Sequence, residues 1–85
     1  MNNEEYEATK EFVQEGWNAL PKKYQQIFGN VIIAGHGEDE VAAMVGTDDL
    51  TIERIVKESY AFLAKKGYDR EDVHRFMDLM MSYRL

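Results

Sequence analysis

His36 and the acids that follow it form a dense group of ionisable side chains. The stretch GHGEDE, residues 35–40, places this histidine next to Glu38, Asp39 and Glu40. A metal site or an acid–base pair needs side chains that converge. Neighbouring residues of one helix point in different directions, and the stretch lacks both the histidine pair of a zinc helix and the spacing of a calcium loop. We therefore interpret the three acids as a helical first turn, where carboxylates complement the helix dipole.

Other residue patterns that carry chemistry are missing from the sequence. There is no cysteine, which excludes a disulfide framework, a thiolate metal site and a thiol nucleophile. We find no Ser-His-Asp order, no P-loop and no dinucleotide fingerprint. The sequence therefore predicts a non-enzymatic protein without a metal or another cofactor.

Length and composition favour one compact domain over residues 1–85. Hydrophobic residues make up 45% of the chain and aromatic residues 12%, which is too much for a disordered chain despite a net charge of -6. No signal peptide and no apolar run long enough for a membrane span are present, so we expect a cytoplasmic protein that does not bind membranes. Of four successive blocks, only residues 50–66 are positive, with four basic residues against two acids.

Apolar residues recur at helical spacing along the whole chain, and only the short stretch NVIIAG allows a strand. The sequence predicts an all-α domain of five helices, at about residues 3–20, 21–33, 38–45, 50–66 and 69–85. Gly46 is placed to end the third helix in the left-handed conformation, and Asp48 or Asp49 to cap the fourth. Asp69 and Asp72 resemble a capping box for the fifth. The predicted inward-facing residues include Tyr6, Phe12, Val13, Trp17, Leu20, Tyr24, Ile27, Phe28, Val31, Ile32, Val41, Ala42, Val45, Ile52, Val56, Ser59, Leu63, Val73, Phe76, Met77, Met80 and Tyr83.

Residues 18–63 resemble a known family through the segments ALP, EDEVAAMVG and TIERIV. The chain is similar here to the helix-turn-helix of bacterial sigma-factor region 4, to which response-regulator output domains are related. The resemblance implies a helix-turn-helix core at about 18–66, with the helix at 69–85 as an addition. It also implies duplex DNA as ligand, with residues 50–66 as the recognition helix. The residues that the resemblance places against DNA are Thr51, Glu53, Arg54, Lys57, Glu58 and Ala61, with Lys65 and Lys66 available for phosphates.

The charge of this region departs from the family pattern. Residues 38–56, EDEVAAMVGTDDLTIERIV, hold six acidic residues and one basic residue. Five of these carboxylates flank the helix ends that would straddle a DNA backbone. Carboxylates repel phosphates instead of displacing counterions. The acidic residues therefore disfavour DNA binding at the positions where the family binds DNA.

Two interpretations stay open, beside that of an unrelated helical bundle. In the first, the chain is a small transcription-regulatory module that binds DNA weakly or within a complex. In the second, it is an acidic protein-binding inhibitor or adaptor, encoded by a phage or mobile element, that mimics a sigma domain or DNA and acts on RNA polymerase or another regulator. Partner contacts in the second case are Ile55, Phe62, Leu79 and Met81, and the methionine-rich C-terminal helix also predicts a homodimer.

Overall fold

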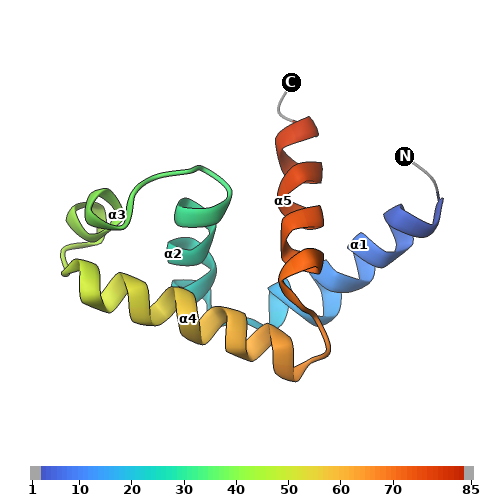
Figure 1. Cartoon of the computed structure of the whole chain (residues 1–85), viewed down its shortest axis with the longest axis horizontal. Helices are drawn as coiled ribbons and strands as arrows, with labels where there is room; N and C mark the ends of the chain where they lie inside the picture. Colours follow the sequence, from blue (N-terminus) through green and yellow to red (C-terminus); the bar gives the residue numbers. More distant parts are fainter. Residues whose placement is uncertain (1–2, 84–85) are drawn as a thin grey trace.

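The computed structural model describes residues 3–83, which form five α-helices and one short 3-10 turn (Figure 1). No strand occurs among these residues, so the all-α prediction is confirmed. The segment NVIIAG continues a helix and then turns. In chain order the elements are α1 (Asn3–Glu15), η1 (Trp17–Ala19), α2 (Lys22–Ile32), α3 (Glu38–Val45), α4 (Asp49–Lys65) and α5 (Arg70–Tyr83).

Helix α4 is the longest helix among the described residues and forms the base of the molecule (Figure 1). Helices α2 and α3 pack along its N-terminal part, while α1 and α5 stand at its C-terminal end. Helix α5 packs against α1 and leaves the outer face of α4 uncovered. The C-terminal helix therefore does not mask α4.

Two hydrophobic clusters hold these helices together, and α2 and α4 contribute to both. The first cluster joins α1, α2, α4, α5 and the residue after η1 through Phe12, Leu20, Phe28, Leu63, Val73 and Phe76. The second joins α2, α3 and α4 through Ile27, Val41, Ala42, Ile52 and Ile55. Burying side chains of this size contributes roughly 1.5–3 kcal/mol each. The α2–α3–α4 unit therefore has a core of its own.

The predicted first helix, residues 3–20, is wrong at its C-terminal end because the chain turns at Gly16. A Cβ atom at Gly16 would lie 2.9 Å from the carbonyl oxygen of Phe12 and 3.1 Å from the side chains of Leu63 and Tyr68. Glycine is the residue that permits this close approach to α4 and to the segment after it. The chain then re-enters the core through η1.

Trp17 lies on η1, and its ring contacts two helices. Its ring stacks on Phe28 of α2 at 5.8 Å and lies 5.1 Å from Phe76 of α5, as measured between ring centroids. The tryptophan thus fills the space between α2 and α5.

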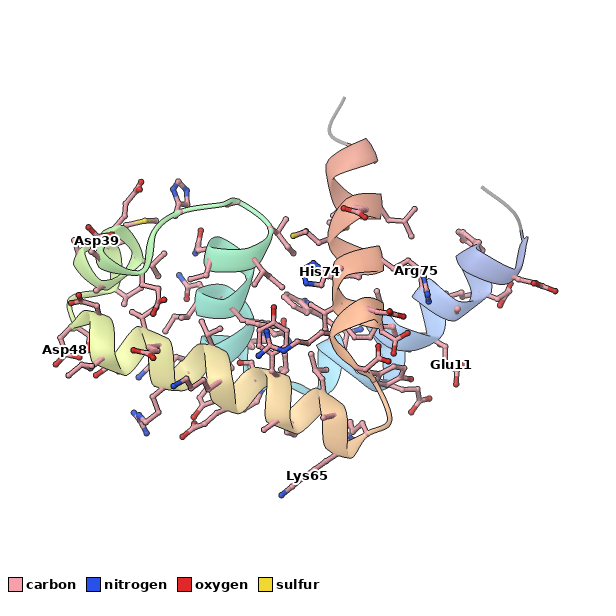
Figure 2. All side chains as sticks on the ribbon, viewed as in Figure 1. Glu11, Asp39, Asp48, Lys65, His74 and Arg75 are labelled. Carbon is pink, nitrogen blue, oxygen red and sulfur yellow. The ribbon has the colours of Figure 1, made fainter. Side chains whose placement is uncertain are left out.

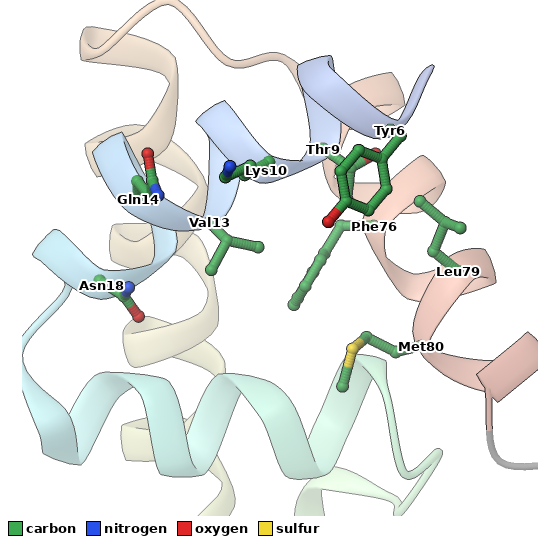
Figure 3. Close-up of a pocket in the computed structure, with 9 residues that line it drawn as sticks. All are labelled: Tyr6, Thr9, Lys10, Val13, Gln14, Asn18, Phe76, Leu79 and Met80. Carbon is green, nitrogen blue, oxygen red and sulfur yellow. The ribbon is translucent and has the colours of Figure 1, made fainter. Parts of the chain in front are cut away.

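Three residues predicted to face the core are exposed instead. Val45 is 37% exposed, Tyr6 51% and Met80 39%. Val45 is the last residue of α3, where Gly46 turns the chain away from the core. Tyr6 and Met80 line an open groove between α1 and α5 (Figure 3). The side chain of Tyr83, also predicted to face inward, lies outside the described side chains.

Candidate binding surface of helix α4

The position of α4 is set by a three-residue turn. Gly46 adopts the left-handed conformation, with φ 75° and ψ 40°, and its N–H and that of Thr47 both donate to the carbonyl of Ala42. Asp48 then caps α4, because its carboxylate accepts the backbone N–H of Thr51 at 2.8 Å. Both predicted end signals, the glycine and the capping aspartate, are confirmed.

Thr51, one of the predicted contact residues, donates hydrogen bonds to Asp48. Bonds from the side chain and then from the backbone N–H of Thr51 hold the pKa of Asp48 below its ordinary value. Thr51 is half-buried. Its main observed role is therefore to begin the helix.

The inner face of α4 fixes which residues point outward. Ile52, Ile55 and Leu63 are buried in the two clusters, and buried Ser59 satisfies its hydroxyl by donating to the carbonyl of Ile55 at 2.8 Å. The prediction that Ile55 contacts a partner is wrong: its side chain is only 2% exposed because it lies one turn before Ser59 on the inner face. The residues exposed on the outer face are Glu53, Arg54, Lys57, Ala61 and Lys65.

The cations in the middle of this outer face are paired within the helix. Nζ of Lys57 lies 3.1 Å from Oε1 of Glu53, and a guanidinium nitrogen of Arg54 lies 3.5 Å from Oε1 of Glu58. Each pair joins residues four positions apart, in the arrangement that stabilises a helix by about 0.2–0.5 kcal/mol. The middle of the outer face therefore has no net charge.

Glu58 interacts with two helices, because it pairs with Arg54 on α4 and also accepts a hydrogen bond from α2. The hydroxyl of Tyr24, on α2, donates to Oε2 of Glu58. This hydrogen bond, followed by burial, raises the pKa of Tyr24 above its ordinary value. Sequence spacing along α4 did not reveal this contact, since the residues are 34 positions apart.

The N-terminal end of α4 is acidic. Asp48 and Asp49 lie at this end, and Figure 2 shows Asp39 of α3 on the same side of the molecule as Asp48. Leu50 directly follows Asp48 and Asp49, is 76% exposed, and lines a shallow depression of ≈ 380 Å³ with the paired residues. The remaining residues of that depression are Glu53, Arg54, Lys57 and Glu58.

The C-terminal end of α4 is basic and meets the start of α2. A second depression of ≈ 390 Å³ is lined by Pro21, Tyr24, Glu58, Ala61, Phe62 and Lys65. Lys66 lies 5.5 Å from the centre of the Phe62 ring, and Lys22 and Lys23 follow Pro21 directly. Within the part of the chain that the structure describes, these four lysines form no ion pair. The unpaired positive charge of this face is therefore concentrated at one end (Figure 2, Lys65).

Predicted contact residues on α5 lie apart from this face. Leu79 lines a groove of ≈ 400 Å³ between α1 and α5, together with Tyr6, Val13, Phe76 and Met80 (Figure 3). The side chain of Met81 lies outside the described side chains. The predicted residues thus divide between the α4 face, the buried core at Ile55, and the α1–α5 groove.

The histidine and acids of residues 35–40 form a simple pair rather than a converging cluster. Nδ1 of His36 lies 2.9 Å from a carboxylate oxygen of Glu40. Among the described residues, no three His, Cys, Asp or Glu side chains are grouped so as to hold a metal ion. In the same part of the chain, no helix has the length and apolar character needed to cross a membrane.

Comparisons with protein-family models, with curated proteins and with solved structures found no match.

Proposed function

We propose that this chain is a non-enzymatic transcription-regulatory module with a helix-turn-helix core that binds a protein partner through the outer face of α4. Support for the core comes from the three-residue turn at Gly46 and from the separate hydrophobic cluster of α2, α3 and α4. The partner we propose is RNA polymerase or another regulatory protein.

The observation that carries the choice of protein over DNA is the pairing of Arg54 and Lys57 with glutamates one turn away. A phosphate that recruits either cation must separate it from its glutamate, and the freed carboxylate then stays within one helical turn of that phosphate. Phosphate contacts provide essentially all non-specific DNA affinity. A paired, neutral helix surface provides little of it.

Protein surfaces suit this face better. Exposed ion pairs can exchange partners with the charged rim of an interface, and apolar Leu50 and half-buried Phe62 supply contact area that water leaves on binding. Charge pairs at a rim give specificity and faster association rather than much affinity. We therefore assign Leu50, Ala61 and Phe62 to contact area, and the four paired residues to specificity.

A second candidate function is weak DNA binding within a larger complex. The four unpaired lysines at the basic end, Lys22, Lys23, Lys65 and Lys66, favour it because they can contact phosphates without breaking an ion pair. In this case the C-terminal end of α4, rather than its N-terminal half, faces the DNA backbone.

Photo-crosslinking tests the proposed function. A benzophenone amino acid is placed at Lys57, on the outer face, and as a control at Gln14, an exposed position on α1. Both proteins are irradiated in nuclease-treated lysate of the source organism. We expect a discrete protein adduct at position 57 that unlabelled wild-type chain competes away and the Arg54→Glu variant does not. Adducts equal at the two positions contradict the proposal, and so do adducts to nucleic acid alone in a parallel lysate without nuclease.

A further inference from the structure

The outer face of α4 carries opposite charges at its two ends. Asp48 and Asp49 lie at the N-terminal end, near Asp39 of α3 in Figure 2, while Lys65 and Lys66 lie at the C-terminal end, where Lys65 and Pro21 line one depression. Fifteen positions separate Leu50 from Lys65, which is about 22 Å along a helix. The two ends therefore cannot neutralise each other within one molecule.

Each end also presents apolar surface. At the acidic end Leu50 is 76% exposed, although Ile52 and Ile55 already anchor this part of α4 to the core. At the basic end Pro21, Ala61 and Phe62 line the depression of ≈ 390 Å³, and Lys65 lies at its edge. Leu50 is an exposed side chain that directly follows Asp48 and Asp49, whereas the Phe62 depression is a hollow with Lys65 at its edge.

One acidic residue, Glu58, lines the hollow, but it repels an acidic ligand only weakly. Its carboxylate already accepts the hydroxyl of Tyr24 and pairs with Arg54. The lysines around the hollow have no such partner in the described part of the chain. The hollow therefore favours a binding partner that inserts an apolar side chain and carries acidic residues around it.

From this complementarity we infer that the occupant is a second copy of the same chain, whose Leu50 end inserts into the Phe62 depression. Acids next to Leu50 then face the lysines of the neighbouring copy. The two surfaces are different, so the contact is head-to-tail and each complex keeps one free end of each kind. Copies add to open chains rather than closing into a symmetric dimer. The inference does not depend on the identity of the proposed regulatory partner.

The contact is small and depends on exposed charges, so the association is weak and salt-sensitive. Interfaces below about 1,200 Å² belong to transient complexes, and exposed ion pairs contribute about 0–1 kcal/mol each. Because both ends lie on the face assigned to the regulatory partner, self-association and partner binding compete.

Sedimentation velocity at protein concentrations up to about 1 mM and about 0.02 M salt, where screening is weak, tests the inference. Leu50→Lys removes the exposed apolar side chain, and Ala61→Glu places an acid in the hollow. Both sites are exposed, so folding, checked by circular dichroism, is preserved. Control variants with the same charge changes are Glu7→Gln and Ala8→Glu on the exposed side of α1.

We expect the average mass of the wild type to rise with protein concentration and to fall when salt is added. Each variant alone associates at least about tenfold more weakly, whereas the controls behave like the wild type. An equimolar mixture of the two variants forms a 1:1 complex, because Ala61→Glu keeps an intact Leu50 and Leu50→Lys keeps an intact hollow.

A wild type that stays monomeric under all these conditions overturns the inference. Association that neither variant weakens also overturns it, as expected for a symmetric dimer through α5, and so does a mixture that fails to form the 1:1 complex. If either variant misfolds, Leu50→Ala and Lys65→Glu test the same two ends by the same measurements.

Discussion

The guanidinium of Arg54 lies 3.5 Å from the carboxylate of Glu58, which also accepts a hydrogen bond from Tyr24 on the neighbouring helix. One carboxylate thus neutralises a cation of the outer face and ties α2 to α4. The candidate binding surface and the stability of the α2–α4 packing therefore share residues, and several substitutions separate the two roles.

Tyr24→Phe removes the hydroxyl that donates to Glu58 while keeping the ring. We expect the free energy of unfolding, measured by urea denaturation at neutral pH, to fall by about 1 kcal/mol. Tyr6→Phe, on the exposed part of α1, is the matched control and leaves it unchanged. Equal stability of the Tyr24→Phe variant and the wild type contradicts a stabilising role for this hydrogen bond.

The same tyrosine predicts a loss of stability at alkaline pH. Hydrogen bonding to Glu58 and burial raise the pKa of Tyr24 in the folded state, so folding favours the protonated phenol. Its contribution is complete below pH about 10 and is lost as the pH rises through the folded-state pKa. Burial raises the pKa of Tyr68 in the same direction. We therefore expect Tyr24→Phe to reduce the alkaline loss of stability, measured by urea denaturation across pH 9–12, without removing it.

Asp48 predicts the opposite pH dependence. Hydrogen bonds from Thr51 lower the pKa of Asp48, so its contribution is complete above the unfolded-state value near 3.9 and is lost as the pH falls through the folded-state pKa. Asp48→Ala lowers the melting temperature at neutral pH, whereas Asp48→Asn keeps a cap and a higher melting temperature. Thermal melts of the two variants that coincide at pH 7 contradict the capping role.

Gly46 and Gly29 respond to alanine in opposite directions. Gly46 has φ 75°, where a Cβ atom is strained, so Gly46→Ala lowers the free energy of unfolding by about 1 kcal/mol. Gly29 lies within α2, and an added Cβ would meet Trp17 at an ordinary 3.6 Å. Gly29→Ala therefore raises the free energy of unfolding by about 0.5–1 kcal/mol. Urea denaturation measures both, and a Gly46→Ala variant as stable as the wild type would contradict the left-handed turn.

Ile55 and Leu50 differ in burial although both are large aliphatic residues of α4. Ile55→Ala removes a fully packed side chain and lowers the free energy of unfolding by about 2–5 kcal/mol. Leu50→Ala changes it by less than about 0.5 kcal/mol, because the side chain is 76% exposed. Chemical denaturation of both variants checks the assignment of the two faces of α4.

Local signals in the sequence were enough to predict the helices. The capping aspartates and Gly46 act through their own backbone neighbours, so their effects can be read from short segments. The reciprocal hydrogen bonds between Asp69 and Asp72, at 2.9 and 3.0 Å, likewise confirm the predicted capping box at the start of α5. The end of α1 at Gly16 was missed because it depends on Leu63 and Tyr68, which are distant in sequence.

The candidate surface was predictable only along α4. The family resemblance placed Glu53, Arg54, Lys57 and Glu58 together, but Ile55, predicted as a partner contact, is buried. The contribution of Pro21 and Tyr24 depends on how α2 crosses α4, and no spacing rule within one helix contains that information. Counting charge over residues 50–66 likewise concealed the separation between a neutral middle and a basic end.

The affinity of the chain for duplex DNA at low salt tests the central claim. The claim is that the ion pairs on α4 prevent this face from binding DNA phosphates. The measurement is fluorescence anisotropy of a labelled mixed-sequence duplex at about 0.02 M salt and upward. We predict no saturable binding by the wild type, and measurable affinity for the Glu53→Gln and Glu58→Gln double variant, whose log Kd rises with log salt with a slope of about 2, one unit per freed cation. Tight, strongly salt-dependent binding by the wild type that Arg54→Glu abolishes would contradict the claim.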